Sequence, residues 1–199
     1  TPKENGTADT KVALDNYGLI YKNSGVTYNL GQQSFALGDQ GLMFDNTGFI
    51  GREMAGVQAL KVDAEVGKTQ LMAFHGQLSK SAASQDKSLK LSGLSVKAPL
   101  GKDSNVGLTY AHSSHEVFGS KNHYALDLEH NIGKLSLQSE GLRSSAKDDN
   151  KGYAFTVGYK PTEKDYFAVS LHRTEANADI AGMTAFENDQ RGLRYQYSR

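Results

Sequence analysis

Hydrophobic and polar residues alternate with a period of two along most of this chain. In the stretch KGYAFTVGYKPTEKDYFAVSLHR, which spans 151–173, apolar side chains alternate with small or polar ones on both sides of a short polar turn. This pattern predicts a β-hairpin with one apolar face. The same pattern predicts eleven strands, at 17–22, 25–30, 54–65, 69–78, 88–98, 104–112, 122–131, 134–143, 151–160, 165–173 and 191–198. Helical periodicity is not convincing anywhere, so the sequence predicts an all-β protein.

Most predicted strands have one clearly apolar parity, and 88–98 is an exception. In 122–131, Leu126 and Leu128 share one parity while Asp127 and Glu129 share the other. Within 88–98 the apolar residues have one parity before Gly93 and the other parity after it. A glycine at such a change is typical of a β-bulge, so we expect one there.

The connections between the predicted strands alternate strictly in length. Short joins lie at 22–25, 66–68, 101–103, 131–133 and 161–163, and longer ones lie at 31–53, 79–87, 113–121, 144–150 and 174–190. Bacterial outer-membrane barrels have short turns at one end and long loops at the other. The sequence therefore predicts an antiparallel up-and-down transmembrane β-barrel, with its apolar parity toward lipid. The alternative is a soluble β protein whose polar parity faces the solvent.

Composition agrees with a barrel that encloses water. Only 38% of the residues are hydrophobic, which is little for a sandwich core but enough for strands that are apolar on one face. All ten tyrosines lie in predicted strands, as expected for rings at a membrane interface. The chain has no cysteine, which excludes disulfides and thiolate metal sites. Its 22 basic and 22 acidic residues are evenly spread, which argues against nucleic-acid binding.

The ends of the chain differ in their position relative to the short turns. The first predicted strand starts at the long-loop end, and the last one stops at the short-turn end. Single-chain outer-membrane barrels have an even number of strands and both termini on the short-turn side. We therefore expect 1–199 to be one partial barrel, the C-terminal part of a larger one, with an odd number of strands before Thr1.

One passage resembles a known family. The residues GVTYNLGQQSFALGDQGLMFDNTGF (25–49) resemble a strand-and-loop passage of the OmpM-like porins of diderm Firmicutes, whose N-terminus carries an S-layer-homology domain. The ending RGLRYQYSR resembles the closing strand of a porin. The resemblance implies a homotrimer in outer-membrane lipid and lipopolysaccharide, with about sixteen strands around a water-filled pore in each subunit. It implies binding to peptidoglycan or another cell-wall polymer only through a domain that this chain does not contain.

Two short motifs resemble sites of chemistry, but neither has the required context. Val66-Gly67-Lys68-Thr69 ends like a phosphate-binding loop, but it lacks the leading glycine and lies between two strands. The run His112-Ser113-Ser114-His115 offers a serine near histidines, as a hydrolase or metal site would. Histidines three apart on a strand point to opposite faces. We therefore expect no cofactor, no metal and no enzymatic activity.

The polar parity predicts the lining of the pore. The candidates on strands are Lys61, Asp63, His75, Asp127, Glu129, Glu140, Lys160, His172 and Arg194. The segment 31–53 is rich in apolar residues, so we expect it to fold against the inside of the wall and to constrict the pore, or to pack a subunit interface. Its candidate charges are Asp39, Asp45, Arg52 and Glu53.

These features favour an outer-membrane porin for small hydrophilic solutes and ions. Two alternatives remain at this point. The first is an outer-membrane anchor or adhesin whose barrel is plugged. The second, ranked lowest, is a barrel enzyme such as a lipase, which requires a serine and a histidine side by side at the lipid-exposed rim.

Overall fold

The computed structural model describes residues 17–47, 56–78, 89–115 and 119–199 of the chain. Eleven strands form one antiparallel sheet in the order β1-β2-β5-β6-β7-β8-β9-β10-β11-β12-β13. Their bounds are β1 Tyr17–Asn23, β2 Val26–Gln33, β5 Val57–Val66, β6 Thr69–Leu78, β7 Lys90–Pro99, β8 Ser104–His115, β9 Gly119–Ile132, β10 Leu135–Ser144, β11 Lys151–Tyr159, β12 Tyr166–Thr174 and β13 Gln190–Ser198. The prediction of an all-β, antiparallel up-and-down fold is confirmed. No helix within the described ranges is long and apolar enough to cross a membrane.

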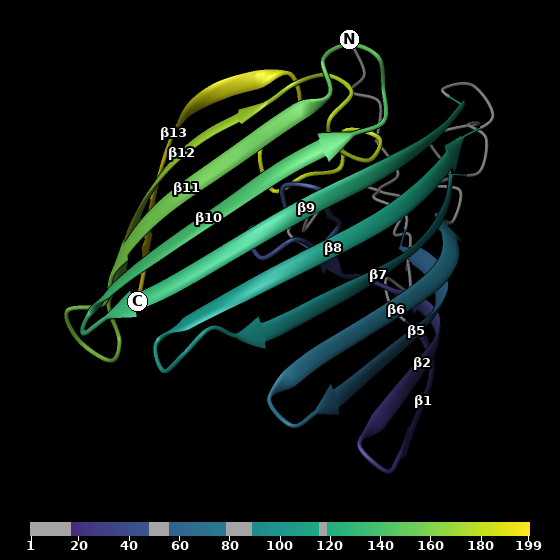
Figure 1. Cartoon of the computed structure of the whole chain (residues 1–199), viewed down its shortest axis with the longest axis horizontal. Coiled ribbons are helices and arrows are strands. Elements are labelled where there is room, and N and C mark those ends of the chain that lie inside the picture. The colour runs from purple at the N-terminus through teal and green to yellow at the C-terminus, as the bar shows by residue number, and fades with distance from the viewer. Residues whose placement is uncertain (1–16, 48–55, 79–88, 116–118) are drawn as a thin grey trace, which may run out of the picture.

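The sheet is strongly curved, and its strands are tilted and run side by side (Figure 1). The short turns lie together at one end of the strands and the longer connections at the other. The β1–β2 turn has only two residues, Ser24 and Gly25, with φ of 48° and 81°. Two consecutive positive φ angles are what a tight hairpin turn needs to match the twist of its strands. The sheet is open, with β1 and β13 as its edges.

The convex outer face carries the large apolar side chains that the alternation predicts. Leu108, Leu126 and Phe155 are 60%, 47% and 45% exposed. These residues belong to different strands, and the strand register aligns Leu108 with Leu126. A soluble sheet would bury such a row, because exposing it to water costs about 25 cal/mol for each Å². An apolar face of this extent suits contact with lipid.

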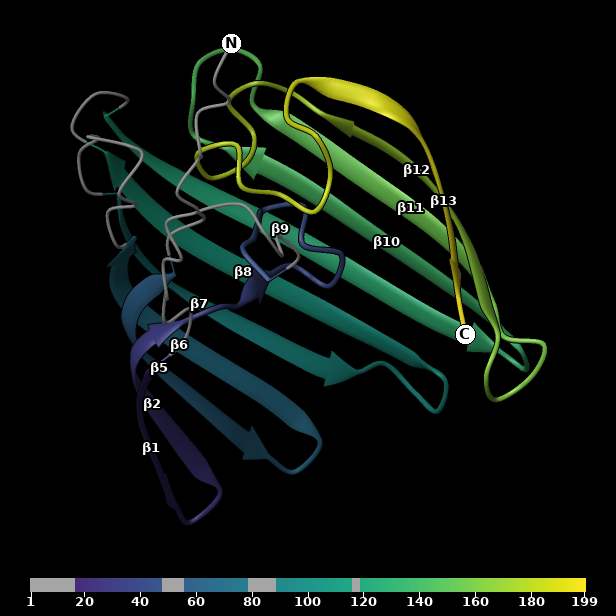
Figure 2. The same ribbon diagram turned by 180° about the vertical axis from the view of Figure 1, so that it is seen from behind.

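The concave inner face carries an apolar cluster of a different origin. The β2–β5 connection and the β12–β13 connection both lie on this face (Figure 2). The first contains the short strands β3 (Ala36–Leu37) and β4 (Phe44–Asp45), which pair with each other. Buried side chains from the two connections pack against the wall, among them Leu37, Leu42 and Ile180, each at most 1% exposed. The described part of the molecule therefore has its core on the inside of the curved sheet.

The predicted bulge at Gly93 is absent. β7 pairs residue by residue with both neighbours through this position, since Gly93 lies opposite Phe74 and Ala111. The apolar parity changes because Leu91 faces inward into the core while Leu94 faces outward. The pattern therefore reflects the inner core, which covers one part of the strand, and not an inserted residue.

The predicted long loop at 113–121 is also corrected. β8 continues to His115 and β9 begins at Gly119. The pairs Ser113–Lys121 and Ser114–Ser120 extend the ladder beyond the predicted strand ends. Period-two apolar patterning stops before this point, so the sequence does not reveal the extension.

Candidate functional site

The inner face of β9 and β10 holds two buried carboxylates side by side. Asp127 and Glu140 lie directly opposite each other in the register of the two strands. They are 2% and 1% exposed. A buried carboxylate is costly unless hydrogen-bond donors surround it. The donors come from the β2–β5 connection.

Backbone amides of the segment 38–43 hold both carboxylates. The Asp39 amide donates to Asp127 Oδ1 at 2.9 Å. The amides of Gln40 and Leu42 donate to Glu140 Oε2 at 2.9 and 3.3 Å, and the Met43 amide donates to Glu140 Oε1 at 3.2 Å. Successive amides that converge on one anion form a concave site for negative charge. Here the anion belongs to the wall, so the arrangement fastens the segment to the barrel.

Glycines make this arrangement possible. Gly38 and Gly41 have φ of 85° and 67°, a region that favours glycine. A Cβ on Gly38 would also overlap the carboxylate of Glu140. The sequence Leu-Gly-Asp-Gln-Gly-Leu-Met at 37–43 therefore combines two glycines for the turn with flanking apolar residues for the core.

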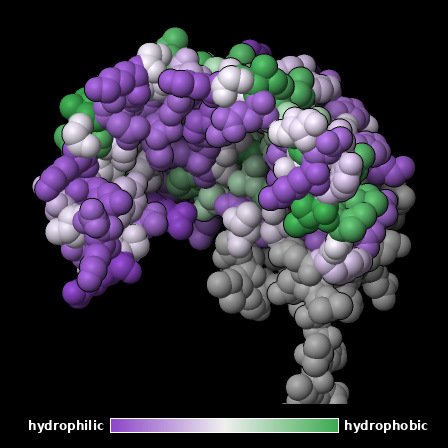
Figure 3. Space-filling model, turned by 90° about the horizontal axis from the view of Figure 1, so that it is seen from below, coloured by the Kyte–Doolittle hydropathy of each residue, from purple (hydrophilic) through white to green (hydrophobic). Residues whose placement is uncertain are grey.

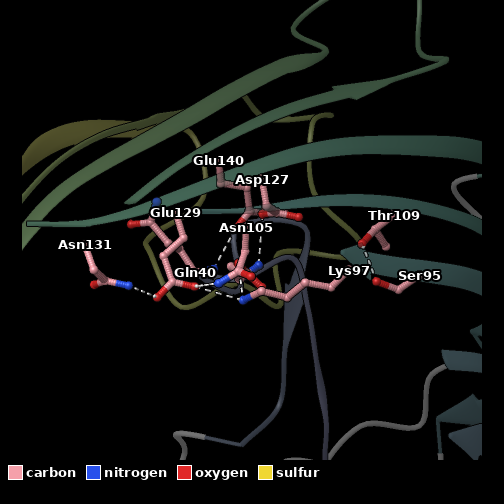
Figure 4. Close-up of polar contacts among 10 residues, drawn as sticks. Gln40, Ser95, Lys97, Asn105, Thr109, Asp127, Glu129, Asn131 and Glu140 are labelled. Atoms are coloured by element: carbon pink, nitrogen blue, oxygen red, sulfur yellow. Dashed lines mark hydrogen bonds and ion pairs between the residues drawn. The ribbon is translucent and has the colours of Figure 1, made fainter. Parts of the chain in front are cut away.

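Lys97 on β7 links the same segment to the wall through side chains. Its ammonium lies 2.7 Å from Asp39 Oδ2 and 3.2 Å from Glu129 Oε2. Asn105 Nδ2 also donates to Glu129 Oε2, at 3.2 Å. Figure 4 shows this network, with Lys97 reaching from its strand toward the carboxylates. One cation on the inner face thus neutralises a charge of the segment and a charge of the wall.

A hollow of about 440 Å³ borders this network. It is lined by charged and polar groups of β5, β6 and β7, including Asp63, Glu65, Gln70 and Lys97, and by Asp39 of the segment. Lys61 and Asp63 form an ion pair at 2.9 Å on the same face. Seen from the short-turn end, the sheet arches around a hollow space (Figure 3). Charged side chains that border a hollow are suited to contact dissolved ions.

Most of the residues predicted to line the pore lie on the inner face. Those on strands with inner parity are Lys61, Asp63, Asp127, Glu129, Glu140, His172 and Arg194. Asp39 joins the Lys97 network, and Asp45 accepts hydrogen bonds from Thr47, the shorter from its hydroxyl at 2.6 Å. The described part of segment 31–53 therefore folds against the inner wall.

His75 is wrongly assigned by parity. It lies opposite Leu60, which is 44% exposed on the outer face. Met72 and Phe74 take the inner parity of β6 because they pack against the core under the β2–β5 connection. Apolar residues thus occupy both faces of this strand, and the polar parity is not the inner one.

The remaining candidates do not join the site. Lys160 follows the last residue of β11 and is exposed at the short-turn end. Arg52 and Glu53 lie outside the described residues. The side chains that the sequence did not single out are Lys97 and Gln40, whose Nε2 donates to the Ala154 carbonyl oxygen at 3.2 Å. A lysine among apolar residues of a strand was a usable signal for Lys97.

The serine and histidine motif gives a contact on the inner face. Ser113 Oγ lies 3.0 Å from His123 Nε2 of the next strand, and His123 Nδ1 lies 2.9 Å from the carbonyl oxygen of Ala178. His123 is fully buried. The pair joins two strands to the β12–β13 connection and does not lie at an outer rim. Among the described residues, no group of three or more metal-ligating side chains is arranged to hold an ion.

Comparisons with known proteins agree with the fold. No protein-family model matches the chain, and no curated protein matches its sequence. Two solved variants of the porin of Rhodobacter blastica are similar to it, each with a TM-score of 0.54 and 15% identity over 79% of this chain. OmpT of Vibrio cholerae, an outer-membrane protein solved as a trimer, has a TM-score of 0.49 and 12% identity, with 95% of this chain and 82% of that chain covered. This chain spans 49% of the length of the Rhodobacter porin chains. At this identity the likeness concerns the fold, which is that of a porin-type barrel wall.

Proposed function

We propose that this chain forms part of the wall of an outer-membrane porin, which passes small hydrophilic solutes and ions by passive diffusion. The observation that carries this proposal is the division of the curved sheet into an apolar outer face and a charged inner face. An apolar band on the outside matches the lipid contact of outer-membrane barrels, whose interior is polar. Charges that line a wet pore remain hydrated, so they do not need buried partners.

The inner charges are proposed to affect the passing solute in two ways. Asp63 and Lys97 border the hollow and would contact passing ions directly, and Lys61 is paired with Asp63 on the same face. Asp127 and Glu140 are buried beneath residues 34–47 of the β2–β5 connection (segment 34–47), so they would act by holding that segment inside the pore. A segment held in this way narrows the pore, and the charges beside it set ion preference.

Planar-bilayer recording on the intact native protein tests the proposal. A porin gives stepwise increases of current as single channels insert. Insertion is checked independently by the heat-dependent gel mobility of a folded barrel. Insertion without current would contradict the proposal.

A plugged anchor or adhesin is the second candidate, and one observation favours it. Two connections and an apolar cluster fill part of the inner side. A barrel filled in this way over its whole cross-section would show folded-barrel mobility without conductance. The bilayer experiment therefore separates the two candidates.

We also propose a cellular location and an oligomeric state for the protein. An outer-membrane location, contact with lipid and lipopolysaccharide, and a homotrimer follow from the resemblance of 25–49 to OmpM-like porins and from the porin-type fold. Membership of the subfamily with an S-layer-homology domain rests on that resemblance alone. Native mass spectrometry in detergent measures the subunit mass and the number of subunits together. A monomer would overturn the trimer.

A further inference from the structure

The β12–β13 connection, which together with the flanking strand residues Thr174 and Gln190 spans residues 174–190, folds onto the inner face although its sequence does not stand out as apolar. Four of its apolar side chains are at most 8% exposed: Ala178, Ile180, Met183 and Phe186. They belong to the same core cluster as Leu42 and Met43 of segment 34–47. Connections at the long-loop end of a barrel usually lie in solvent. This one is built to stay inside.

Main-chain hydrogen bonds join this connection to segment 34–47. The Ile180 amide donates to the Met43 carbonyl at 3.0 Å, and the Asp45 amide donates to the Met183 carbonyl at 2.8 Å. The Ala185 amide and the Thr184 hydroxyl both donate to the Gly41 carbonyl, at 3.0 and 3.1 Å. The two pieces of chain, joined by bonds such as that from Thr184 to Gly41 across 143 positions of the sequence, therefore form one inner body.

The wall holds the connection at separate points. The Ser144 hydroxyl donates to the Asn177 carbonyl at 2.6 Å, and His123 Nδ1 contacts the Ala178 carbonyl. At the other end, the Phe186 ring lies 4.7 Å from the His172 ring. Arg194 Nη1 donates to the Ala185 carbonyl at 3.0 Å. These contacts come from β9, β10, β12 and β13, so the connection spans the inner face of the C-terminal half of the sheet.

We propose that residues 174–190 form a second constriction, which acts with segment 34–47 to set the largest solute that passes. This inference rests on the proposed pore. Segment 34–47 is fastened over β9 and β10 by Asp127 and Glu140, while 174–190 covers the space beside it toward β13. Because each supports the other through main-chain bonds, the opening depends on both.

A pair of adjacent substitutions tests this inference. Ile180→Asp adds a charge at a position that is 1% exposed, so it should drive the connection out of the core. Ala181→Asp adds the same charge one residue later, where the side chain is exposed and φ is 60°, a conformation that Asp tolerates. Both variants are made in the intact protein and checked for folded-barrel gel mobility. A third variant, in which a short Gly-Ser turn replaces 176–188, removes the obstruction without adding charge.

The readouts are single-channel conductance and the largest sugar that swells liposomes carrying the protein. We expect both to rise in Ile180→Asp and in the shortened variant and to stay at the wild-type value in Ala181→Asp. A folded, conducting shortened variant with the wild-type sugar limit would overturn the second constriction. A silent wild type with a conducting shortened variant would overturn the proposed porin and leave 174–190 as the plug. The absence of current from the wild type and from all the variants would overturn both proposals.

Discussion

Glu140 shows that a polar residue on the inner face of the sheet can bind another segment of the protein instead of contacting water. Its carboxylate accepts hydrogen bonds from three amides of segment 38–43. Glu129, on the same face of the neighbouring strand, instead meets the ammonium of Lys97. Parity alone assigns both residues to the pore lining. The difference between them comes from the segment that lies over one and beside the other.

Glu140→Gln should loosen segment 38–43. The glutamine places an NH₂ group among amides that need acceptors, so at least one buried donor loses its partner, at a cost of about 1–3 kcal/mol. We expect faster hydrogen exchange at the Gln40, Leu42 and Met43 amides. Glu129→Gln is the matched control, since it leaves these amides with their acceptor. Unchanged exchange in Glu140→Gln would contradict the fastening role.

Asp179 is the residue through which pH should act on the second connection. It is 3% exposed, and it accepts hydrogen bonds from the Gly182 amide at 2.8 Å and from Asn188 Nδ2 at 2.7 Å. Burial raises the pKa of its carboxyl from 3.8 to about 6, although these hydrogen bonds oppose the rise. The carboxyl therefore binds a proton more tightly while the connection is in place than when it is released.

The sign of the pH effect follows from proton binding. Between pH 3.8 and about 6, the connection in place binds more protons at Asp179 than the released connection. The free energy of release therefore falls as pH rises through this window and is constant above it. Hydrogen exchange of 179–185, corrected for the intrinsic pH dependence, measures this energy. Asp179→Asn should remove the dependence, and Asp189→Asn, at an exposed position of the same connection, should keep it.

At the scale of single elements, strands with one apolar face could be predicted from the sequence. β11 alternates along its whole length and β9 alternates from His123 to Glu129, and their inner and outer residues there agree with the prediction. β6 could not be assigned in this way, because Met72 and Phe74 face the inner core while Leu71 faces outward. Facing is predictable where only lipid and water compete for a strand. It becomes ambiguous where another piece of protein covers the inner face.

The two inner connections also differ in how far their inward fold could be predicted from the sequence. Segment 31–53 has closely spaced large apolar residues, so the inward fold of its described part, 31–47, could be predicted. In residues 174–190, four buried apolar side chains are spread among small and polar residues, and their burial depends on partners far away in sequence. Asp127 and Glu140 also find their donors in another element. Contacts of this kind have no local signal in the sequence.

Facing can be measured on β9 with single cysteines, because the native chain has none. In membranes, Glu129→Cys should react quickly with a small charged thiol reagent, because its side chain borders the polar inner side. Leu128→Cys should react slowly, although it is 44% exposed in the protein alone, because lipid would cover it. Equal reaction rates at the two positions would contradict the lipid-facing assignment.

The outer face of β9 also gives a prediction of stability. Leu126 lies in the middle of the strand and points outward, next to Leu108 of β8. Leu126→Arg should lower barrel stability by about 2–4 kcal/mol, the cost of Arg near the middle of a bilayer. Reversible urea unfolding in lipid vesicles measures the change. Thr109→Ser, a small change on the inner side of β8, serves as a control for handling of the variants. A loss of stability in Leu126→Arg that is smaller than the loss in this control would speak against lipid contact at Leu126.

For the whole molecule, zero net charge conceals a strong separation of charge. The chain has 22 acidic and 22 basic residues. Those within the described ranges are nearly absent from the exposed apolar face and lie instead on the inner face, in the connections and at the strand ends. Around the hollow, Lys97 is placed opposite carboxylates of the wall and of segment 34–47. In a pore, fixed charges at close range raise the local concentration of ions of opposite sign. Ion preference should therefore depend on the balance in this hollow and not on the total charge.

Lys97→Glu tests that dependence directly. The substitution replaces the one ammonium that contacts both Asp39 and Glu129 by a third carboxylate, so the hollow becomes more negative and should favour cations. We expect the reversal potential in a salt gradient to move toward that of an ideally cation-selective pore, with a larger shift at low salt, because screening weakens as the Debye length grows to about 30 Å at 0.01 M. Lys102→Glu makes the same change of charge in the exposed β7–β8 turn, outside the hollow, and should shift the potential less. Equal shifts from the two substitutions would mean that ion preference is set by the overall charge of the protein, and the role of the hollow would have to be abandoned.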